Sequence, residues 1–234
     1  MDRYIIAVGG GEIKEKQTLK IDEYICDLAK KRAGQNRAVA LFLGTASHDH
    51  MPYYNSFHKT YTGVFGLKTD CALIVDREID YEKIRGKFNS ADLIYVGGGD
   101  TLFMIDQWKK SGIFDMIIGA YNRGVILCGL SAGAICWFEN MYTDSRIIQG
   151  KSNSYFFEKG IGLLRGSACP HYEVRRNDLL CNDLNLLPSP VLCIESLSAV
   201  VFKNEEIEGQ ITCGGNSFII TDNKSEKVLT SIIK

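Results

Sequence analysis

A serine between two glycines is the strongest candidate for chemistry in this 234-residue chain. The apolar run Gly124–Leu130 predicts a buried strand, Gly129-Leu130-Ser131-Ala132-Gly133 predicts a tight turn, and Ala134–Phe138 predicts the start of a helix. A serine at the apex of a strained strand–turn–helix can act as a nucleophile, and small neighbours let the two backbones pass closely. The same pattern also fits a glycine turn whose serine merely caps a helix, so the rest of the chain must decide.

A serine nucleophile needs a base, and the chain contains four histidines. His171 follows an apolar segment and Pro170, which holds its neighbours extended, and it is the candidate general base. Asp144 is the candidate carboxylate that would orient the imidazole and stabilise its cation. Glu139 is a competing acid, expected on the helix after Ser131 and only two turns away from it. The alternatives are an ordinary loop histidine and an ordinary turn aspartate.

The glycine run Gly97-Gly98-Gly99 ends another predicted strand. It lacks the lysine and the spacing of a phosphate-binding loop, and it does not match the dinucleotide-binding fingerprint. A glycine amide can approach a substrate closely, so an amide of this run is a candidate second donor to an oxyanion, beside the amide of Ala132. A flexible turn without a catalytic role is the alternative.

A metal site is the other chemistry that the histidines suggest. His48 and His50 flank Asp49 after a predicted strand, and His58 is expected on a helix. Two histidines one residue apart are a weak signal for a metal without a third ligand. We therefore predict no metal and no organic cofactor.

The composition is that of an ordinary globular protein, with 45% hydrophobic and 24% charged residues. A net charge of -1 gives no electrostatic reason to expect nucleic acid or a membrane surface as a partner. The first apolar run, Tyr4–Val8, is too short for a signal peptide, and no run approaches the roughly 18 apolar residues of a membrane span. The eight cysteines include no pair spaced two residues apart, which favours buried thiols in a reducing compartment. These features predict a cytoplasmic protein.

Strands and helices are expected to alternate through the first 130 residues. The expected strands before the serine are Tyr4–Val8, Ala38–Leu43, Cys71–Val75, Asp92–Val96 and Gly124–Leu130. The expected helices are Leu19–Lys31, Tyr53–Tyr61, Ile84–Phe88, Thr101–Lys110 and Ile113–Asn122. Continuous apolar strands predict an α/β fold with a mostly parallel sheet and helices on both faces. A ligand would bind at the carboxyl ends of these strands, where the glycine clusters lie.

The region after Asn140 has a different pattern. Short apolar runs at Val191–Ile194, Ala199–Phe202 and Phe218–Ile220 are separated by polar turns. We predict extra mixed strands near the C-terminus, partly antiparallel, that close one side of a single domain over residues 1–234.

Several segments together resemble the peptidase E and cyanophycinase family of serine peptidases over nearly the whole chain. They are Ile94–Thr101, Gly129–Ala134, Thr143–Ser145, Gly162–Gly166, Cys169–Tyr172 and Ile194–Ala199. The resemblance implies a fold like that of class I glutamine amidotransferases, with a serine in place of their cysteine. It also implies that Ser131 is the nucleophile, His171 the general base and Asp144 the orienting acid, with the amides of Gly99 and Ala132 as the oxyanion hole.

The sequence departs from the family pattern at two points. The residue after the glycine run is usually asparagine and is Asp100 here, which brings a negative charge towards the pocket. The best-studied members cleave dipeptides with an amino-terminal aspartate, whose carboxylate binds an arginine beyond the histidine. Arg175 and Arg176 follow His171 more closely than that arginine does. Adjacent helical residues point about 100° apart, so we expect Arg176 to face the substrate and Arg175 to face solvent.

These observations predict a serine peptidase that hydrolyses short peptides, including dipeptides with an amino-terminal aspartate, through an acyl-enzyme. One alternative is an α/β-hydrolase esterase, although the acid of such enzymes usually lies on a much later strand than Asp144, 13 residues beyond Ser131. The other is a family member that binds a small metabolite without turnover. The sequence leaves open whether the chain forms a homo-oligomer.

Overall fold

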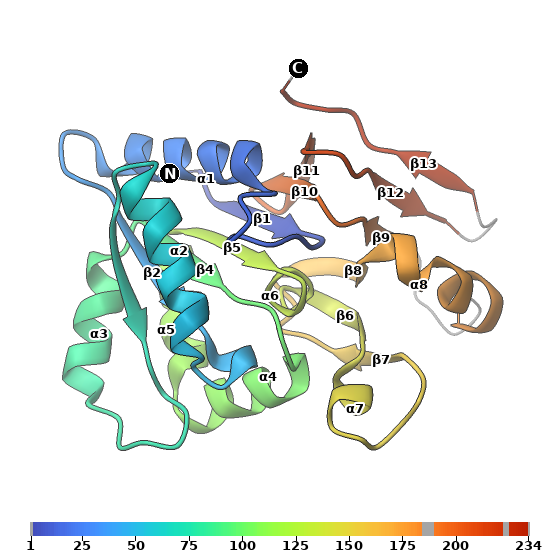
Figure 1. The fold of residues 1–234 in the computed structure, drawn as a ribbon, viewed down its shortest axis with the longest axis horizontal. Helices are drawn as coiled ribbons and strands as arrows, with labels where there is room; N and C mark the ends of the chain where they lie inside the picture. The colour runs from blue at the N-terminus through green and yellow to red at the C-terminus, as the bar shows by residue number, and fades with distance from the viewer. Residues whose placement is uncertain (1, 184–189, 222–224, 234) are drawn as a thin grey trace.

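The computed structural model describes residues 2–183, 190–221 and 225–233, which form two β-sheets with helices around the first (Figure 1). Within these residues the first sheet has seven strands in the order β11-β10-β1-β5-β4-β2-β3. Its strands are β1 (Tyr4–Val8), β2 (Val39–Leu43), β3 (Lys68–Ala72), β4 (Leu93–Val96), β5 (Ile126–Leu130), β10 (Ser198–Lys203) and β11 (Glu206–Thr212). The first five are parallel, and β10 and β11 extend the sheet antiparallel beyond β1.

Helices cover both faces of the first sheet, which confirms the predicted α/β fold (Figure 1). One face carries α1 (Leu19–Ala33) and α2 (Met51–Gly63), and the other carries α3 (Tyr81–Ser90), α4 (Thr101–Lys110) and α5 (Ile113–Asn122). Successive side chains of each strand are buried against opposite layers, because a strand alternates its side chains between faces. None of the helices in the described ranges has the length and hydrophobicity that a membrane-spanning helix requires.

The extra mixed strands predicted near the C-terminus are divided between the two sheets: Val191–Ile194 and Phe218–Ile220 lie in the second sheet, whereas Ala199–Phe202 lies in β10 of the first. In the described residues the order of the second sheet is β13-β12-β9-β8-β6-β7. The strands are β6 (Phe138–Thr143), β7 (Phe156–Lys159), β8 (Leu164–Pro170), β9 (Val191–Ile194), β12 (Ser217–Ile220) and β13 (Glu226–Val228). The remaining elements are α6 (Ala132–Ile135), α7 (Ser145–Ile148), α8 (Tyr172–Asp178), the 3₁₀ turn η1 (Thr45–Ser47) and the π-helical turn η2 (Leu179–Asp183). Strands β6, β8 and β9 are parallel, whereas β7, β12 and β13 pair antiparallel.

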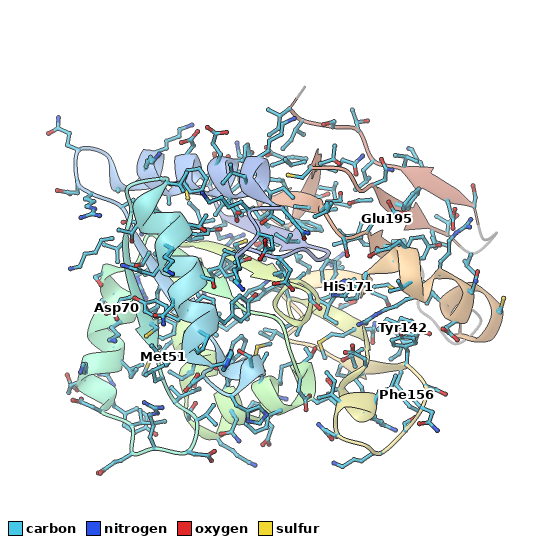
Figure 2. The ribbon with its side chains drawn as sticks, in the orientation of Figure 1. Met51, Asp70, Tyr142, Phe156, His171 and Glu195 are labelled. Carbon is cyan, nitrogen blue, oxygen red and sulfur yellow. The ribbon has the colours of Figure 1, made fainter. Side chains whose placement is uncertain are left out.

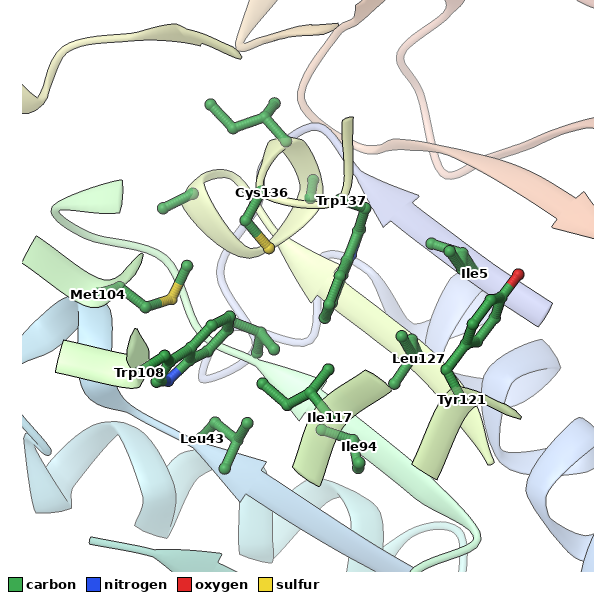
Figure 3. Packing of buried hydrophobic residues seen from close by; sticks show 14 of the residues in the cluster. Ile5, Leu43, Ile94, Met104, Trp108, Ile117, Tyr121, Leu127, Cys136 and Trp137 are labelled. Carbon is green, nitrogen blue, oxygen red and sulfur yellow. The ribbon is translucent and has the colours of Figure 1, made fainter. Parts of the chain in front are cut away.

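One hydrophobic cluster contains residues from both sheets. Figure 3 shows Trp108 and Trp137 close together with Met104 and Cys136, and the two indole rings are 6.5 Å apart and stacked. Ile194 at the end of β9 belongs to the same cluster. The cysteines are free thiols and six of the eight are buried. Because protein interiors are close-packed, this shared core fixes the ends of the second-sheet strands relative to the end of β5.

Two of the differences between the predicted and the observed element boundaries have a clear structural cause. The third strand lies at Lys68–Ala72 instead of Cys71–Val75, because the amides of Ile74 and Val75 donate to the carboxylate of Asp49. The helix predicted over Ala134–Phe138 ends at Ile135, since the chain enters β6 at Phe138. Glu139, predicted on that helix, consequently lies on a strand of the second sheet.

Candidate active site

The predicted nucleophile and base are brought together by the ends of two strands from different sheets. Ser131 directly follows β5, and His171 directly follows β8. The Nε2 atom of His171 lies 2.8 Å from the Oγ atom of Ser131, which is hydrogen-bond distance. The backbone amide of His171 also donates to the carbonyl of Gly9, at 3.2 Å. Figure 2 shows His171 where the two sheets meet.

The backbone at Ser131 is strained, as the sequence predicts for a serine on a tight strand-to-helix turn. Its φ is 54° and its ψ is -108°, a conformation that L-residues rarely adopt. The turn also requires a glycine two residues later, since a Cβ atom at Gly133 would overlap the backbone of Val96 on the neighbouring strand. This close packing presents the Ser131 side chain beside the cavity instead of burying it.

The glycine run after β4 lies beside Ser131. A Cβ atom at Gly98 would be 3.4 Å from the Cβ of Ser131, and the amide of Gly98 donates to the Tyr53 hydroxyl at 3.3 Å. Gly99 has a φ of 138°, and a side chain there would overlap the carbonyl of Ala46. The glycine run and the serine therefore lie at the same edge of the sheet, because β4 and β5 are parallel neighbours and both segments follow the carboxyl ends of these strands.

The other nitrogen of His171 contacts Ser196, which lies in the quoted segment Ile194–Ala199 but was given no role from the sequence. Its Nδ1 atom lies 3.1 Å from the Oγ atom of Ser196. The Ser196 hydroxyl donates to Oε1 of Glu173 at 2.5 Å, and the Ser196 amide donates to Oε2 of the same carboxylate at 2.9 Å. Ser196 follows β9, which is parallel to β8, so polar residues directly after these two strands were the signal available in the sequence.

Asp144 lies near the imidazole but bonds to another group. Its carboxylate is 2.9 Å from the guanidinium of Arg175, whose side chain is only 4% exposed. Arg175 also donates to the Tyr142 carbonyl at 2.9 Å and lies 4.8 Å from the centre of the Tyr155 ring. The hydrogen bond expected between Asp144 and His171 is thus replaced by an ion pair with an arginine that was expected in solvent. Glu139 accepts a hydrogen bond from the Gly166 amide.

Two further charged residues lie away from their expected positions at the pocket. Arg176 forms a two-pronged ion pair with Glu226, with N–O distances of 2.7 and 2.8 Å, and does not line the cavity beside Ser131. Asp100 caps α4 by accepting from the Phe103 amide and also accepts from Gln149 at 2.8 Å. Its negative charge is therefore stabilised by a helix N-terminus instead of facing a substrate.

A cavity of about 730 Å³ opens beside the serine. This volume falls within the roughly 300–1,000 Å³ typical of small-molecule sites. Its walls include Ser131, His171 and Ser196, and the loop between β1 and α1 adds Glu12 and Lys14. His50, at the start of α2, also lines the cavity.

The charges around His171 favour the neutral imidazole. Burial lowers the pKa of His171, and the nearby Arg175 lowers it further, whereas Glu173 and Asp144 act in the opposite direction. Burial acts to raise the pKa of Glu173, but the hydrogen bonds from Ser196 outweigh it, so the pKa of this carboxyl is lowered. A neutral imidazole next to an ionised carboxylate is the state in which His171 can accept a proton.

The His48 and His50 pair is divided between two surroundings. The ring of His48 packs against Phe103, with centroids 4.1 Å apart, whereas His50 lines the cavity. Asp49 between them binds the amides of Ile74 and Val75. Within the described ranges, no group of three or more His, Cys, Asp or Glu side chains is arranged to hold a metal ion.

Comparisons with known proteins identify a peptidase family and related folds. The model of peptidase family S51 matches residues 5–209. The uncharacterized peptidase YgaJ of Bacillus subtilis (strain 168) is 35% identical over 172 residues, which cover 73% of this chain and 69% of the relative. The fold is similar to that of a peptidase from an acI-B1 actinobacterium, with a TM-score of 0.75, 18% identity and coverage of 99% and 96% of the two chains. A putative peptidase E protein from Listeria monocytogenes EGD-e gives a TM-score of 0.64 at 18% identity, covering 91% of this chain and 99% of that one.

Proposed function

The chain belongs to peptidase family S51 and is a serine-type peptidase, and from this premise we propose that it hydrolyses short peptides with Ser131 as the nucleophile. The observation that carries the proposal is the 2.8 Å contact between the Ser131 hydroxyl and Nε2 of His171. A serine hydroxyl is a weak nucleophile until an adjacent base accepts its proton, and His171 is within reach to do so. The strained backbone of Ser131 supports the same role, because nucleophile elbows have this geometry.

The reaction follows from these two side chains. The Ser131 Oγ atom attacks the carbonyl carbon of the peptide bond while its proton passes to Nε2 of His171. The imidazolium then donates this proton to the leaving amine as the C–N bond breaks, which leaves an acyl-enzyme ester on Ser131. Water attacks the ester while His171 accepts its proton. The imidazolium then returns this proton to Oγ of Ser131 as the ester C–O bond breaks, which releases the carboxylic acid product.

The amides of Gly99 and Ala132 are the proposed oxyanion hole. Support comes from the position of the glycine run beside Ser131 and from the place of Ala132 as the first residue of α6. Amides fixed in this way stabilise negative charge that develops on the carbonyl oxygen, at no cost of reorganisation.

The cavity lining supports a short peptide as substrate. A short peptide carries a cationic amine and at least one carboxylate, and the loop between β1 and α1 offers both a carboxylate, Glu12, and an ammonium, Lys14. We propose that dipeptides with an amino-terminal aspartate are among the substrates. Lys14 would then bind the aspartate carboxylate, because Arg175 and Arg176 are paired with Asp144 and Glu226.

A fluorophosphonate probe and a dipeptide library test the proposal together. The wild-type protein should be labelled by the probe and should cleave dipeptides, as read by mass spectrometry. Ser131→Ala should be unlabelled and should lose on the order of 10⁴-fold or more in turnover with its circular dichroism unchanged. A wild-type protein that resists the probe would contradict the proposal, and so would a Ser131→Ala protein that retains most of its activity. Cleavage of esters without cleavage of any peptide in the library would instead indicate an esterase.

A further inference from the structure

The imidazole of His171 is held by a hydroxyl, not directly by a carboxylate. Its Nδ1 atom faces the Ser196 Oγ atom at 3.1 Å, and this oxygen is 2.5 Å from Oε1 of Glu173. The three groups come from two segments far apart in the sequence, the start of α8 and the loop after β9. No other side-chain oxygen in the described ranges is hydrogen-bonded to Nδ1.

Glu173 fixes the direction of the Ser196 hydroxyl. The carboxylate accepts from the Ser196 hydroxyl through Oε1 and from the Ser196 amide through Oε2. An ionised carboxylate has no proton to give, so the hydroxyl proton must point towards Glu173. The lone pairs of the Ser196 oxygen are then left for the imidazole. This oxygen can accept only from a protonated Nδ1, which leaves Nε2 free to accept the proton of Ser131.

The turn after β1 encloses this chain of hydrogen bonds. A Cβ atom at Gly10 would lie 2.5 Å from Nδ1 of His171 and 2.6 Å from Oγ of Ser196, both far inside van der Waals contact. The amide of Leu197 donates to the Gly10 carbonyl at 3.0 Å, which ties the Ser196 loop to the same turn. Glycine at this position allows the backbone to pack directly on the contact between His171 and Ser196.

We propose that Ser196 and Glu173 form a relay that positions His171, with the Ser196 hydroxyl selecting the reactive tautomer and Glu173 holding that hydroxyl. The inference rests on the proposed function, because it assigns the support of the same base. When His171 becomes positively charged during turnover, its Nδ1 proton stays hydrogen-bonded to Ser196. The charge of Glu173 then stabilises the imidazolium through the hydroxyl. Ser196 acts through His171 and Glu173 acts through Ser196, so both are positioning residues.

The test uses three variants: Ser196→Ala, Glu173→Gln and the double variant that combines these two substitutions. Glu139→Gln is the control. Glu139 suits this purpose because its carboxylate accepts a hydrogen bond from a backbone amide, that of Gly166, and is not hydrogen-bonded to His171 or Ser196. We expect Ser196→Ala and Glu173→Gln each to lose about 10²-fold or more in kcat with little change in KM, and Glu139→Gln to remain within about twofold. The probe-labelling rate should fall in parallel, because it also depends on proton transfer from Ser131.

The double variant separates a relay from two independent effects. If Glu173 acts through Ser196, Glu173→Gln should cost less than about threefold when it is added to Ser196→Ala. The acidic limb of the pH profile should also move to lower pH in Glu173→Gln, since the groups that face the imidazole are then Arg175, Asp144 and a neutral amide. The relay would be overturned if the kcat losses of the two single variants were fully additive in the double variant. It would also be overturned if Glu173→Gln changed neither kcat nor the acidic limb of the pH profile. A wild-type protein that resists the probe would instead overturn the proposed function itself.

Discussion

The guanidinium of Arg175 lies 2.9 Å from the carboxylate of Asp144, and both groups lie close to the imidazole of His171. Arg175 is buried and could not be left without a counter-charge at low cost. Asp144 therefore neutralises a cation that would otherwise lower the pKa of His171 further. This relationship changes what a substitution at Asp144 should do.

We expect Asp144→Asn to reduce plateau kcat by less than about tenfold. Asparagine can still accept from Arg175, so the geometry is kept, but the negative charge that raises the pKa of His171 is lost. The acidic limb of kcat/KM should move to lower pH, and the protein should lose about 1–2 kcal/mol of stability. A pH–rate profile measures the shift of the acidic limb, and a urea titration measures the change in stability. A loss of about 10⁴-fold at the plateau would show that Asp144 orients His171 during turnover.

The strand pattern and the positions of Ser131 and His171 at strand ends could be predicted from the sequence because each depends on local signals. The apolar run of β5 and the small residues around Ser131 define a turn within ten residues. The proline before His171 and the apolar segment of β8 mark the end of another strand. Both residues were therefore expected at carboxyl ends of strands, where parallel sheets bind ligands.

The partners of charged side chains could not be predicted in the same way. Glu173 meets Ser196 across 23 positions, and Arg176 meets Glu226 across 50. Such pairs depend on how β8, β9, β12 and β13 are ordered in the second sheet, which periodicity does not reveal. The division of the late strands between two sheets has the same origin, since short apolar runs do not specify their neighbours.

Gly10→Ala should lower activity without unfolding the protein. The new methyl group would overlap the His171 ring and the Ser196 hydroxyl, so the imidazole must shift away from Ser131. A displacement of about 1 Å can cost on the order of 10²-fold in turnover. Gly86→Ala is the matched control, because a Cβ at Gly86 meets nothing within 4 Å. Equal activity of the two variants would show that the site tolerates movement at the β1 turn.

The pH dependence should reflect the lowered pKa of His171. Its acid form cannot accept the proton of Ser131, and burial together with Arg175 lowers its pKa below 6.5. We expect kcat/KM to fall on acidification as His171 becomes protonated, with the midpoint of the fall below the ordinary pKa of histidine. The probe-labelling rate should follow the same curve, because it needs the same base. A limb centred above pH 7 would mean that the imidazolium is stabilised in the free enzyme.

Asp22 should make stability depend on pH. Its carboxyl is buried on α1, accepts from Tyr61 and Thr18, and has a pKa raised to about 6, with desolvation as the main cause. A raised pKa in the folded state means that stability is lost as pH increases from about 4 to about 6, when the folded protein must bury the charge. Asp22→Asn removes that charge. Its amide oxygen can still accept from one hydroxyl, and its NH2 group can donate to the oxygen of the other. Its stability relative to wild type should therefore rise by on the order of 1–3 kcal/mol between pH 4 and pH 7 in urea titrations. If the stability difference between Asp22→Asn and wild type stayed constant over this range, the pKa of Asp22 would not be raised in the folded protein.

Lys14 should determine any preference for an acidic substrate. It is the one ammonium on the cavity wall among the described residues, whereas the guanidinium of Arg176 is paired with Glu226. Lys14→Met keeps most of the aliphatic stem and removes the charge, so cleavage of dipeptides with an amino-terminal aspartate should fall by about tenfold relative to neutral dipeptides. Arg176→Met, with the same loss of charge outside the cavity, should leave this ratio unchanged. The measurement is the ratio of kcat/KM for aspartyl dipeptides to kcat/KM for neutral dipeptides, determined in both variants. It shows which of the two residues provides the preference for an acidic substrate. A selective loss in Arg176→Met alone would mean that its ion pair with Glu226 opens when the substrate binds, and that the arginine provides the specificity.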